Sequence, residues 1–358
     1  MALQASRLML YKNAPAKYDA IMTNLMHAPI LDAPAKTSKP LPRNVSIDVL
    51  KLVLAFMVVG LHTGMLYDVT PTLGYLAVEG VFRIAVPVFL IINGFYFFPV
   101  MERGDTRRWF SRIISLYVFW TVIYACFWAP PLSLSVFGIS KFVVNIIFGY
   151  SHLWYLTGMV GAALVMILLK NWKPRSVLFI SLALYFVGVS IQYAGNYHIF
   201  TSALLDKAAN AHRVHRSFLL LCFPFFYFGF AINKFRLHER ISARYAWCAV
   251  MVGLGLLLLE SYLNFSNPRN DGGFDNFLTL LLVCPAIFIA VHNVKLYSTQ
   301  KRIALYSSGV YLVHYLVLLI LWDQTDIHMS SLTFLVVCLS LAMTAALIPL
   351  SRRAPFIL

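Results

Sequence analysis

Residues 46–66 read SIDVLKLVLAFMVVGLHTGML, a nearly continuous apolar run that carries one aspartate, one lysine and one histidine. At a rise of 1.5 Å per residue, a helix of this length crosses the roughly 30 Å hydrocarbon core of a bilayer. A second apolar run, 75–98, follows after a short connection. The stretch therefore predicts a membrane-spanning helix at the start of a membrane domain.

Further segments of the same apolar character follow along the chain. With the first, the ten expected spans are 46–66, 75–98, 112–128, 153–169, 176–194, 217–233, 245–263, 275–292, 303–322 and 330–350. No internal repeat is visible in the sequence, which weakens the case for a transporter built from two matching halves. The sequence predicts an all-α polytopic membrane protein with about ten transmembrane helices.

Composition excludes the main alternatives to a membrane protein. Hydrophobic residues make up 60% of the 358 residues and charged residues 12%, with a mean hydropathy of +0.75. A soluble domain carries about 25% charged residues, so this chain could not cover its own surface in water. The net charge of +15 lies in short clusters between apolar runs, which is typical of membrane loops and not of nucleic-acid binding. The five cysteines show no metal or redox spacing.

The distribution of Lys and Arg predicts the orientation. With the N-terminus in the cytoplasm, 23 of the 29 basic residues fall on the cytoplasmic side and five in the outer connections, while Arg83 lies within a span. This is a strong positive-inside signal, and an even number of spans returns the C-terminus to the cytoplasm. Residues 1–44 are polar and proline-containing, and we expect them to form a disordered cytoplasmic tail.

Lys51 and His62 lie eleven residues apart in the first span. Eleven residues are close to three helical turns, so both side chains share one face, ~16 Å apart along the axis, and can line one cavity. An ionisable group inside the membrane costs at least about 2.5–3.5 kcal/mol, so its presence needs a reason. Alternatively, Lys51 is a snorkelling residue at the helix end and His62 a hydrogen-bonded packing residue. Asp48 lies one turn before Lys51 and can pair with it.

The second span holds a further charged pair. Glu79 and Arg83 have the i,i+4 spacing of a helical ion pair, and Arg83 lies too deep in the apolar run to be a loop residue. Pro87 frees a backbone carbonyl, and Asn93-Gly94 allows close helix packing. A buried structural pair is the alternative reading of Glu79 and Arg83.

Two later stretches combine histidine with aromatic residues. Residues 152–156 read HLWYL at the start of the fourth span, and residues 309–315 read GVYLVHY in the ninth. Trp154 and Tyr155 alone are explained as interfacial belt residues. Tyr311 and His314 share one helix face, and each histidine taken singly is more often structural than catalytic.

These four stretches, in this order and spacing, resemble the membrane-bound acyltransferase 3 family, which includes bacterial O-acetyltransferases of surface polysaccharides. The resemblance rests on a basic residue ten residues before a histidine (Lys51, His62), an Arg-x-x-x-Pro-x-Phe run closed by a Gly turn (Arg83, Pro87, Phe89, Asn93, Gly94), residues 152–156, and Gly309, Tyr311, Leu312 and His314. Lys51 stands where arginine is commoner, and an ammonium offers a point charge rather than a bidentate fork.

The resemblance covers roughly residues 45–355, which we expect to form an acyltransferase 3-like transmembrane domain. The chain looks closest to the stand-alone branch similar to the enterobacterial common antigen O-acetyltransferase. The implied location is the bacterial cytoplasmic (inner) membrane. The implied reaction moves an acetyl group from cytoplasmic acetyl-CoA, bound as a substrate and not as a resident cofactor, to a hydroxyl of a glycan or polyprenyl-linked saccharide. Neither a metal nor a nucleic acid is expected to take part.

The site hypothesis assigns roles within that reaction. His62 acts as general base, directly or through an acetyl-histidine, while Lys51 and Arg83 attract CoA phosphates or the developing oxyanion. The substrate-binding residues are Glu79, His152, Trp154, Tyr155, Tyr311 and His314, and Asp48 and Asn93 are supporting residues. Among them, His152, Trp154, Tyr155 and His314 shape the acceptor side, where the ring of Trp154 can stack on a sugar. Glu79 and Asp48 orient the cations. The rival function is a transporter or flippase of a sugar or polyprenyl-linked saccharide, because buried His, Arg and Glu also suit a proton-coupled carrier.

Overall fold

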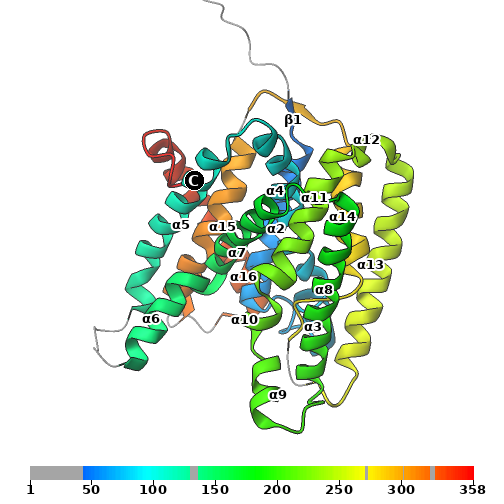
Figure 1. Cartoon of the computed structure of the whole chain (residues 1–358). Helices are drawn as coiled ribbons and strands as arrows, with labels where there is room; N and C mark the ends of the chain where they lie inside the picture. The colour runs from blue at the N-terminus through cyan, green and yellow to red at the C-terminus, as the bar shows by residue number, and fades with distance from the viewer. Residues whose placement is uncertain (1–42, 130–135, 271–272, 301, 323–326) are drawn as a thin grey trace, which may run out of the picture. The chain divides into compact units, whose positions relative to one another are not determined.

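The computed structural model describes residues 43–129, 136–270, 273–300, 302–322 and 327–358. Most of them are helical (Figure 1). The helices are α2 (Ser46–Thr63), α3 (Pro71–Val78), α4 (Ala85–Glu102), α5 (Thr106–Trp128), α6 (Val136–Phe148), α7 (Trp154–Leu168), α8 (Pro174–Asn196), α9 (Ala203–Ala209), α10 (His212–His215), α11 (Phe223–Lys234), α12 (Leu237–Arg240), α13 (Ala243–Phe265), α14 (Leu280–His292), α15 (Arg302–Trp322) and α16 (Met329–Ser351). The short elements are the 3₁₀ turns η1 (Val81–Ile84) and η2 (Ser151–Leu153), the π-helical turn η3 (Phe218–Cys222), and the strands β1 (Arg43–Asn44) and β2 (Tyr297–Ser298).

The prediction of a polytopic helical membrane protein is confirmed. Among the described residues, eight helical segments are long and apolar enough to cross a membrane, and each coincides with one of the expected spans. The other two expected spans, 217–233 and 275–292, are shorter apolar helices, Phe218–Lys234 and Leu280–His292. The second of these begins late because residues 273–279 are irregular. Helix α6 lies in a connection where the sequence predicted no element.

The helices divide into central and peripheral ones. Sixty-one per cent of the most apolar window in Pro71–Glu102 is buried, against 11% in Thr106–Trp128. Figure 1 shows α5 at one flank, α13 at the other, and α2 and α4 between them. Large apolar side chains on the peripheral helices stay exposed, among them Val122, Phe179, Met251 and Phe334. Such surfaces are rare on soluble monomers and suit contact with lipid.

The start of α2 is held by a two-residue ladder. Arg43 and Asn44 pair antiparallel with Ser298 and Tyr297, and the Asn44 side chain donates to the carbonyl of Val294 at 3.0 Å. Of the expected disordered tail over 1–44, residues 1–42 lie outside the described residues. Its last two residues are ordered as β1, so that boundary is two residues too long.

Two glycines let α4 and α11 approach backbone to backbone. A Cβ atom on Gly94 would collide with the carbonyl oxygen of Phe226, and a Cβ on Gly229 with the carbonyl oxygen of Ile91. Small residues at helix crossings of this kind are the usual means of close packing inside a membrane. The expected role of Gly94 in close packing is confirmed.

A third glycine breaks the second span. A Cβ on Gly80 would collide with the carbonyl oxygen of Leu76, and the chain turns from α3 into the 3₁₀ turn η1 at this point. Arg83 belongs to that turn, and Pro87 falls in the first turn of α4, where proline is tolerated. The prediction of one continuous helix over 75–98 is therefore wrong in its first third, where the chain breaks between α3 and α4. The break directs Arg83 inward.

We expect Gly94→Ala and Gly229→Ala each to lower the thermal unfolding midpoint of the detergent-solubilised protein. Overpacking of this kind costs about 1–3 kcal/mol. Gly255→Ala in α13 is the control, because a Cβ there meets no atom within 4 Å. In a helix interior that change stabilises by about 0.5–1 kcal/mol. Midpoints that rise equally in all three variants would contradict the close packing.

Candidate active site

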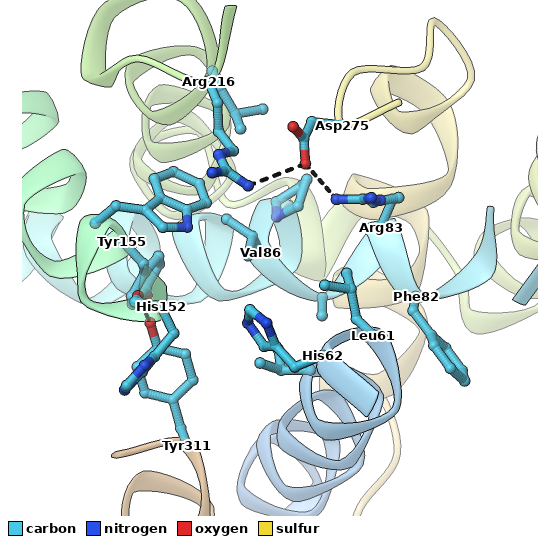
Figure 2. Close-up of a pocket in the computed structure, with 15 residues that line it drawn as sticks. Leu61, His62, Phe82, Arg83, Val86, His152, Tyr155, Arg216, Asp275 and Tyr311 are labelled. Carbon is cyan, nitrogen blue, oxygen red and sulfur yellow. Dashed lines mark hydrogen bonds and ion pairs between the residues drawn. The ribbon is translucent and has the colours of Figure 1, made fainter. Parts of the chain in front are cut away.

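A small cavity lies where α2, η1, α7 and α15 approach one another. Its volume is about 50 Å³, and its polar lining comprises His62, Arg83, His152, Trp154, Tyr155, Arg216, Asp275 and Tyr311. Figure 2 shows His62 on one side of the cavity, the Arg83–Asp275–Arg216 group opposite it, and His152, Tyr155 and Tyr311 along the flank. Six of these residues come from the four stretches that the sequence singled out, namely His62, Arg83, His152, Trp154, Tyr155 and Tyr311. The structure therefore brings distant motifs into one place.

Three imidazoles lie close together here: His62 and His152 line the cavity, and His314 packs behind them. The ring of His62 lies 5.4 Å from that of His314, and His152 lies 5.0 Å from His314. Tyr315 packs against all three rings. His314 is fully buried, and its Nδ1 lies 2.7 Å from the carbonyl oxygen of Tyr311. In the neutral ring this bond places the proton on Nδ1. The Nε2 atom of His314 then carries no proton and can only accept a hydrogen bond.

Arg83 is the centre of the charged side of the cavity. Its two terminal nitrogens form ion pairs with Glu79 and with Asp275, each through a hydrogen bond. The predicted Glu79–Arg83 pair is present, although the two residues are joined by a glycine break and a 3₁₀ turn rather than by a regular helix. The remaining nitrogen, Nε, is buried and has no hydrogen-bond partner among the described residues.

The irregular segment 273–279 places Asp275, because neighbouring helices bind its backbone. Gln192 of α8 accepts from the amides of Asp275 and Asn276 at 2.8 and 2.9 Å. Glu260 of α13 accepts from the amides of Leu278 and Thr279 at 2.8 and 3.0 Å, just before α14 begins. Backbone groups inside a membrane domain need such partners, since water is not available to replace them.

The two oxygens of Asp275 face different partners. Oδ1 meets Arg83 and, at 3.5 Å, Arg216, while Oδ2 faces His212 at 3.3 Å and His215 at 3.5 Å. Burial alone would raise the pKa of Asp275, but Arg216 and Arg83, with hydrogen bonds from the two histidines, hold its pKa well below the ordinary value. The carboxylate is therefore ionised at neutral pH.

His212, His215 and Asp275 also form a set that could hold a metal ion. One ligand atom from each lies within 4.8 Å of the others, and His215 is buried. The same carboxylate, however, already neutralises two guanidinium groups, and both would repel a cation. We therefore describe the set as an ion-pair network and assign no metal to it.

A second, larger cavity adjoins the first. Its volume is about 360 Å³, and it is lined by residues of α2, α4, α5, α7 and α15, among them Lys51, Asn93, Tyr96, Trp109, Arg112, Ser307 and Ser308. The Lys51 ammonium lies 5.6 Å from the centre of the Tyr96 ring. Two residues, Tyr155 and Tyr311, line both cavities. The two cavities therefore meet at these tyrosines.

The sequence-based site requires several corrections. Lys51 and His62 line different cavities, because rings from α7 and α15 stand between them, so the expectation of one shared cavity is wrong. Glu79, His314 and Asp48 line neither of the two cavities. Glu79 and His314 instead contact lining residues from behind, and Asp48 is buried in the first turn of α2.

Trp154 and Asn93 have roles that the sequence did not specify. The guanidinium of Arg216 lies 4.8 Å from the centre of the Trp154 ring, so one face predicted to stack on a sugar is occupied by a cation. Asn93 donates to the Tyr155 hydroxyl at 2.7 Å. It supports the residue that separates the two cavities.

Sequence reasoning missed Asp275, His212, His215 and Arg216. A signal was present, because residues 212–216 read HRVHR beside an apolar run, on the side where basic residues are few. Asp275 was counted as the first residue of a span and given no role. Its importance depends on a non-helical segment that no periodicity reveals.

The fold and the two cavities define a multi-pass membrane protein with a buried titratable site. The family model described as an acyltransferase domain (acyltransferase 3) matches residues 44–351. This chain belongs to that family and is a membrane acyltransferase.

Curated relatives are distant. The chain is 26% identical over 300 residues to a serine/alanine racemase of Enterococcus gallinarum, covering 76% of this chain and 40% of that protein. It is 24% identical over 300 residues to an amino-acid racemase of Enterococcus faecalis, covering 70% of this chain and 42% of that protein. The chain thus spans about two fifths of these relatives, and the named activity is theirs. No solved structure matches.

We expect Asp275→Asn to destabilise the protein, because it leaves buried guanidiniums without their carboxylate. Removing one partner of a buried ion pair costs about 3–5 kcal/mol, measurable as a lower unfolding midpoint in detergent. Asp68→Asn is the control, since Asp68 is an exposed carboxylate bonded to Ser330. A midpoint as high as that of the control would contradict the network.

The same network has a defined pH dependence. Because the pKa of Asp275 is depressed on folding, its contribution is complete above the ordinary value of 3.8 and is lost only as the pH falls below it. The lower unfolding midpoint of Asp275→Asn should therefore persist at every pH from about 5 to 8, and a midpoint equal to that of wild type at pH 5 would contradict the network.

Proposed function

We propose that this acyltransferase moves an acetyl group from cytoplasmic acetyl-CoA to a hydroxyl of a surface or lipid-linked glycan, in the inner membrane of a bacterium. The observation that carries the proposal is the pair of cavities that meet at Tyr155 and Tyr311. One cavity holds cations and polar groups suited to a large anionic donor, and the other holds a histidine suited to proton transfer.

The larger cavity is the proposed donor site. Lys51 and Arg112 line it and would attract the phosphates of CoA, while Trp109 and Tyr96 offer aromatic faces to the adenine. Its volume of about 360 Å³ lies within the range of ligand pockets, roughly 300–1,000 Å³. Lys51 lies near the start of α2, which the distribution of basic residues predicts to be cytoplasmic, where CoA is found.

The smaller cavity is the proposed transfer point. An acceptor hydroxyl placed beside His62 would lose its proton to the imidazole as its oxygen attacks the thioester carbonyl carbon. The new C–O bond forms, the C–S bond breaks, and the CoA thiolate leaves into the donor cavity, where it takes up a proton. His314 and Tyr315, packed against His62, would fix the orientation of its ring.

Arg83 is the proposed stabiliser of the oxyanion. It lines the cavity of His62 and not that of Lys51, so it is placed for the reacting carbonyl rather than for the CoA phosphates. Its buried Nε–H has no partner among the described residues and can donate to a developing negative charge. Glu79 and Asp275 would hold the guanidinium in place.

The acceptor would enter from the end of α2 that carries His62, which is the predicted outer side. Trp154 and Arg216 line the cavity there, with His212 and the Asp275 network beside them. Polar and aromatic side chains of this kind are suited to a sugar. The access is consistent with glycans that are completed outside the cytoplasm.

The test uses membranes that contain the protein, labelled acetyl-CoA and an extract of the host's lipid-linked glycans. We expect wild type to label the glycan fraction and His62→Ala to lose at least about 100-fold in rate, the lower range of general-base catalysis. His328→Ala, which changes an exposed histidine at the start of α16, should retain transfer.

Each other outcome has a definite meaning. Equal transfer by wild type and His62→Ala would remove His62 from the chemistry. Absence of label with every acyl-CoA and glycan fraction would refute the proposed function and favour a transporter of a sugar or polyprenyl-linked saccharide.

A further inference from the structure

Three aromatic rings form a wall between the two cavities. Phe89 lines the larger cavity, and Tyr155 and Tyr311 line both. The ring of Phe89 lies 6.0 Å from each tyrosine ring, and the two tyrosine rings lie 5.6 Å apart. Each ring therefore contacts the other two, and we call the three the aromatic wall.

Hydrogen bonds hold the aromatic wall in one arrangement. The Tyr155 hydroxyl accepts from Asn93, whose amide also donates to the carbonyl of Phe89 at 2.9 Å. The Tyr311 hydroxyl donates to the carbonyl of His152 at 2.5 Å. All three rings are at least nine-tenths buried. The two tyrosine rings cannot change rotamer without breaking these bonds. The ring of Phe89 is held by packing against both of them, so the three rings leave little room for a larger ligand.

The space beyond the wall is small. Attack on the thioester needs the carbonyl carbon about 3–3.5 Å from the acceptor oxygen, so the acyl group must pass the wall into the cavity of His62. That cavity has a volume of about 50 Å³. A protein cavity that takes up benzene, with its six carbon atoms, measures about 150 Å³. An acetyl group has three heavy atoms, whereas butyryl has five and succinyl seven.

The charged groups of the small cavity do not favour binding of a succinyl group either. The two guanidiniums that line the small cavity, Arg83 and Arg216, are already paired with Glu79 or Asp275. A succinyl carboxylate would have to displace a buried carboxylate or lie beside it, and like charges at that distance repel. Size and charge therefore both disfavour the longer acyl group.

We propose that the aromatic wall of Phe89, Tyr155 and Tyr311 determines acyl-chain specificity and restricts the donor to acetyl-CoA. This inference rests on the proposed acyl transfer and adds the acyl class. The part of the acyl chain beyond the carbonyl occupies the space between the wall and His62. Each added methylene therefore meets rings that are fixed from behind.

The experiment compares labelled acetyl-, butyryl- and succinyl-CoA as donors to the extracted glycan fraction, in membranes containing wild type, Phe89→Ala or Phe89→Leu. One methylene in an apolar pocket changes specificity by about 10–200-fold, and butyryl has two more than acetyl, so we expect wild type to prefer acetyl over butyryl by at least about 100-fold. Phe89→Ala should reduce that preference by about tenfold or more, with Phe89→Leu in between. Phe89 does not line the cavity of His62, so the smaller side chain acts by removing the support behind the Tyr155 and Tyr311 rings, which can then move away from that cavity.

Phe98→Ala is the matched control, because Phe98 lies on the same helix, packs against Phe230 and lines neither cavity in the described structure. It should keep the wild-type donor preference.

The inference is overturned if wild type uses butyryl- or succinyl-CoA as readily as acetyl-CoA, or if both Phe89 variants retain the wild-type preference. If Phe89→Ala does not accumulate in the membrane, the donor preferences of Phe89→Leu and of wild type still test whether the aromatic wall sets acyl-chain specificity. Failure of wild type to use acetyl-CoA at all would instead refute the proposed function.

Discussion

An arginine buried among apolar helices must be paired, and the ion pair between Arg83 and Asp275 meets that requirement here. The pair joins parts of the chain that are far apart in sequence: η1 within the second span, the α10 region with Arg216, and the irregular segment before α14. Because Gln192 and Glu260 bind the backbone of that segment, the carboxylate is fixed by α8 and α13 as well. The charged wall of the small cavity thus depends on helices that do not themselves line it.

Helix α2 links the two halves of the proposed reaction. It carries Lys51 into the larger cavity and His62 into the smaller one, so the recognition of an anionic donor and proton transfer sit on one rigid element. The aromatic wall from α4, α7 and α15 stands between them. A donor bound by its phosphates at one end would need to place only its thioester at the wall. In the proposed reaction, this arrangement would let a water-soluble donor and an acceptor from the other side meet without an open channel.

The sequence predicted the helical membrane fold and much of the small cavity, because apolar spans and buried ionisable residues are local signals. His62, Arg83, His152, Tyr155 and Tyr311 do line it. The separation of Lys51 from His62 could not be predicted, since it depends on rings contributed by other helices. Asp275 was missed because it lies in a segment with no periodic pattern, and His314 was placed in the site although it lies behind it. The cytoplasmic location of the termini stays a prediction from the distribution of Lys and Arg.

The proposed reaction is tested most directly by an experimental structure of the protein with a non-hydrolysable acetyl-CoA analogue. We expect the CoA phosphates beside Lys51 and Arg112, and the acetyl carbonyl at Tyr155 and Tyr311, facing His62. An analogue bound with its phosphates at Arg216 and the Asp275 network, or with its acetyl group away from the aromatic wall, would contradict it.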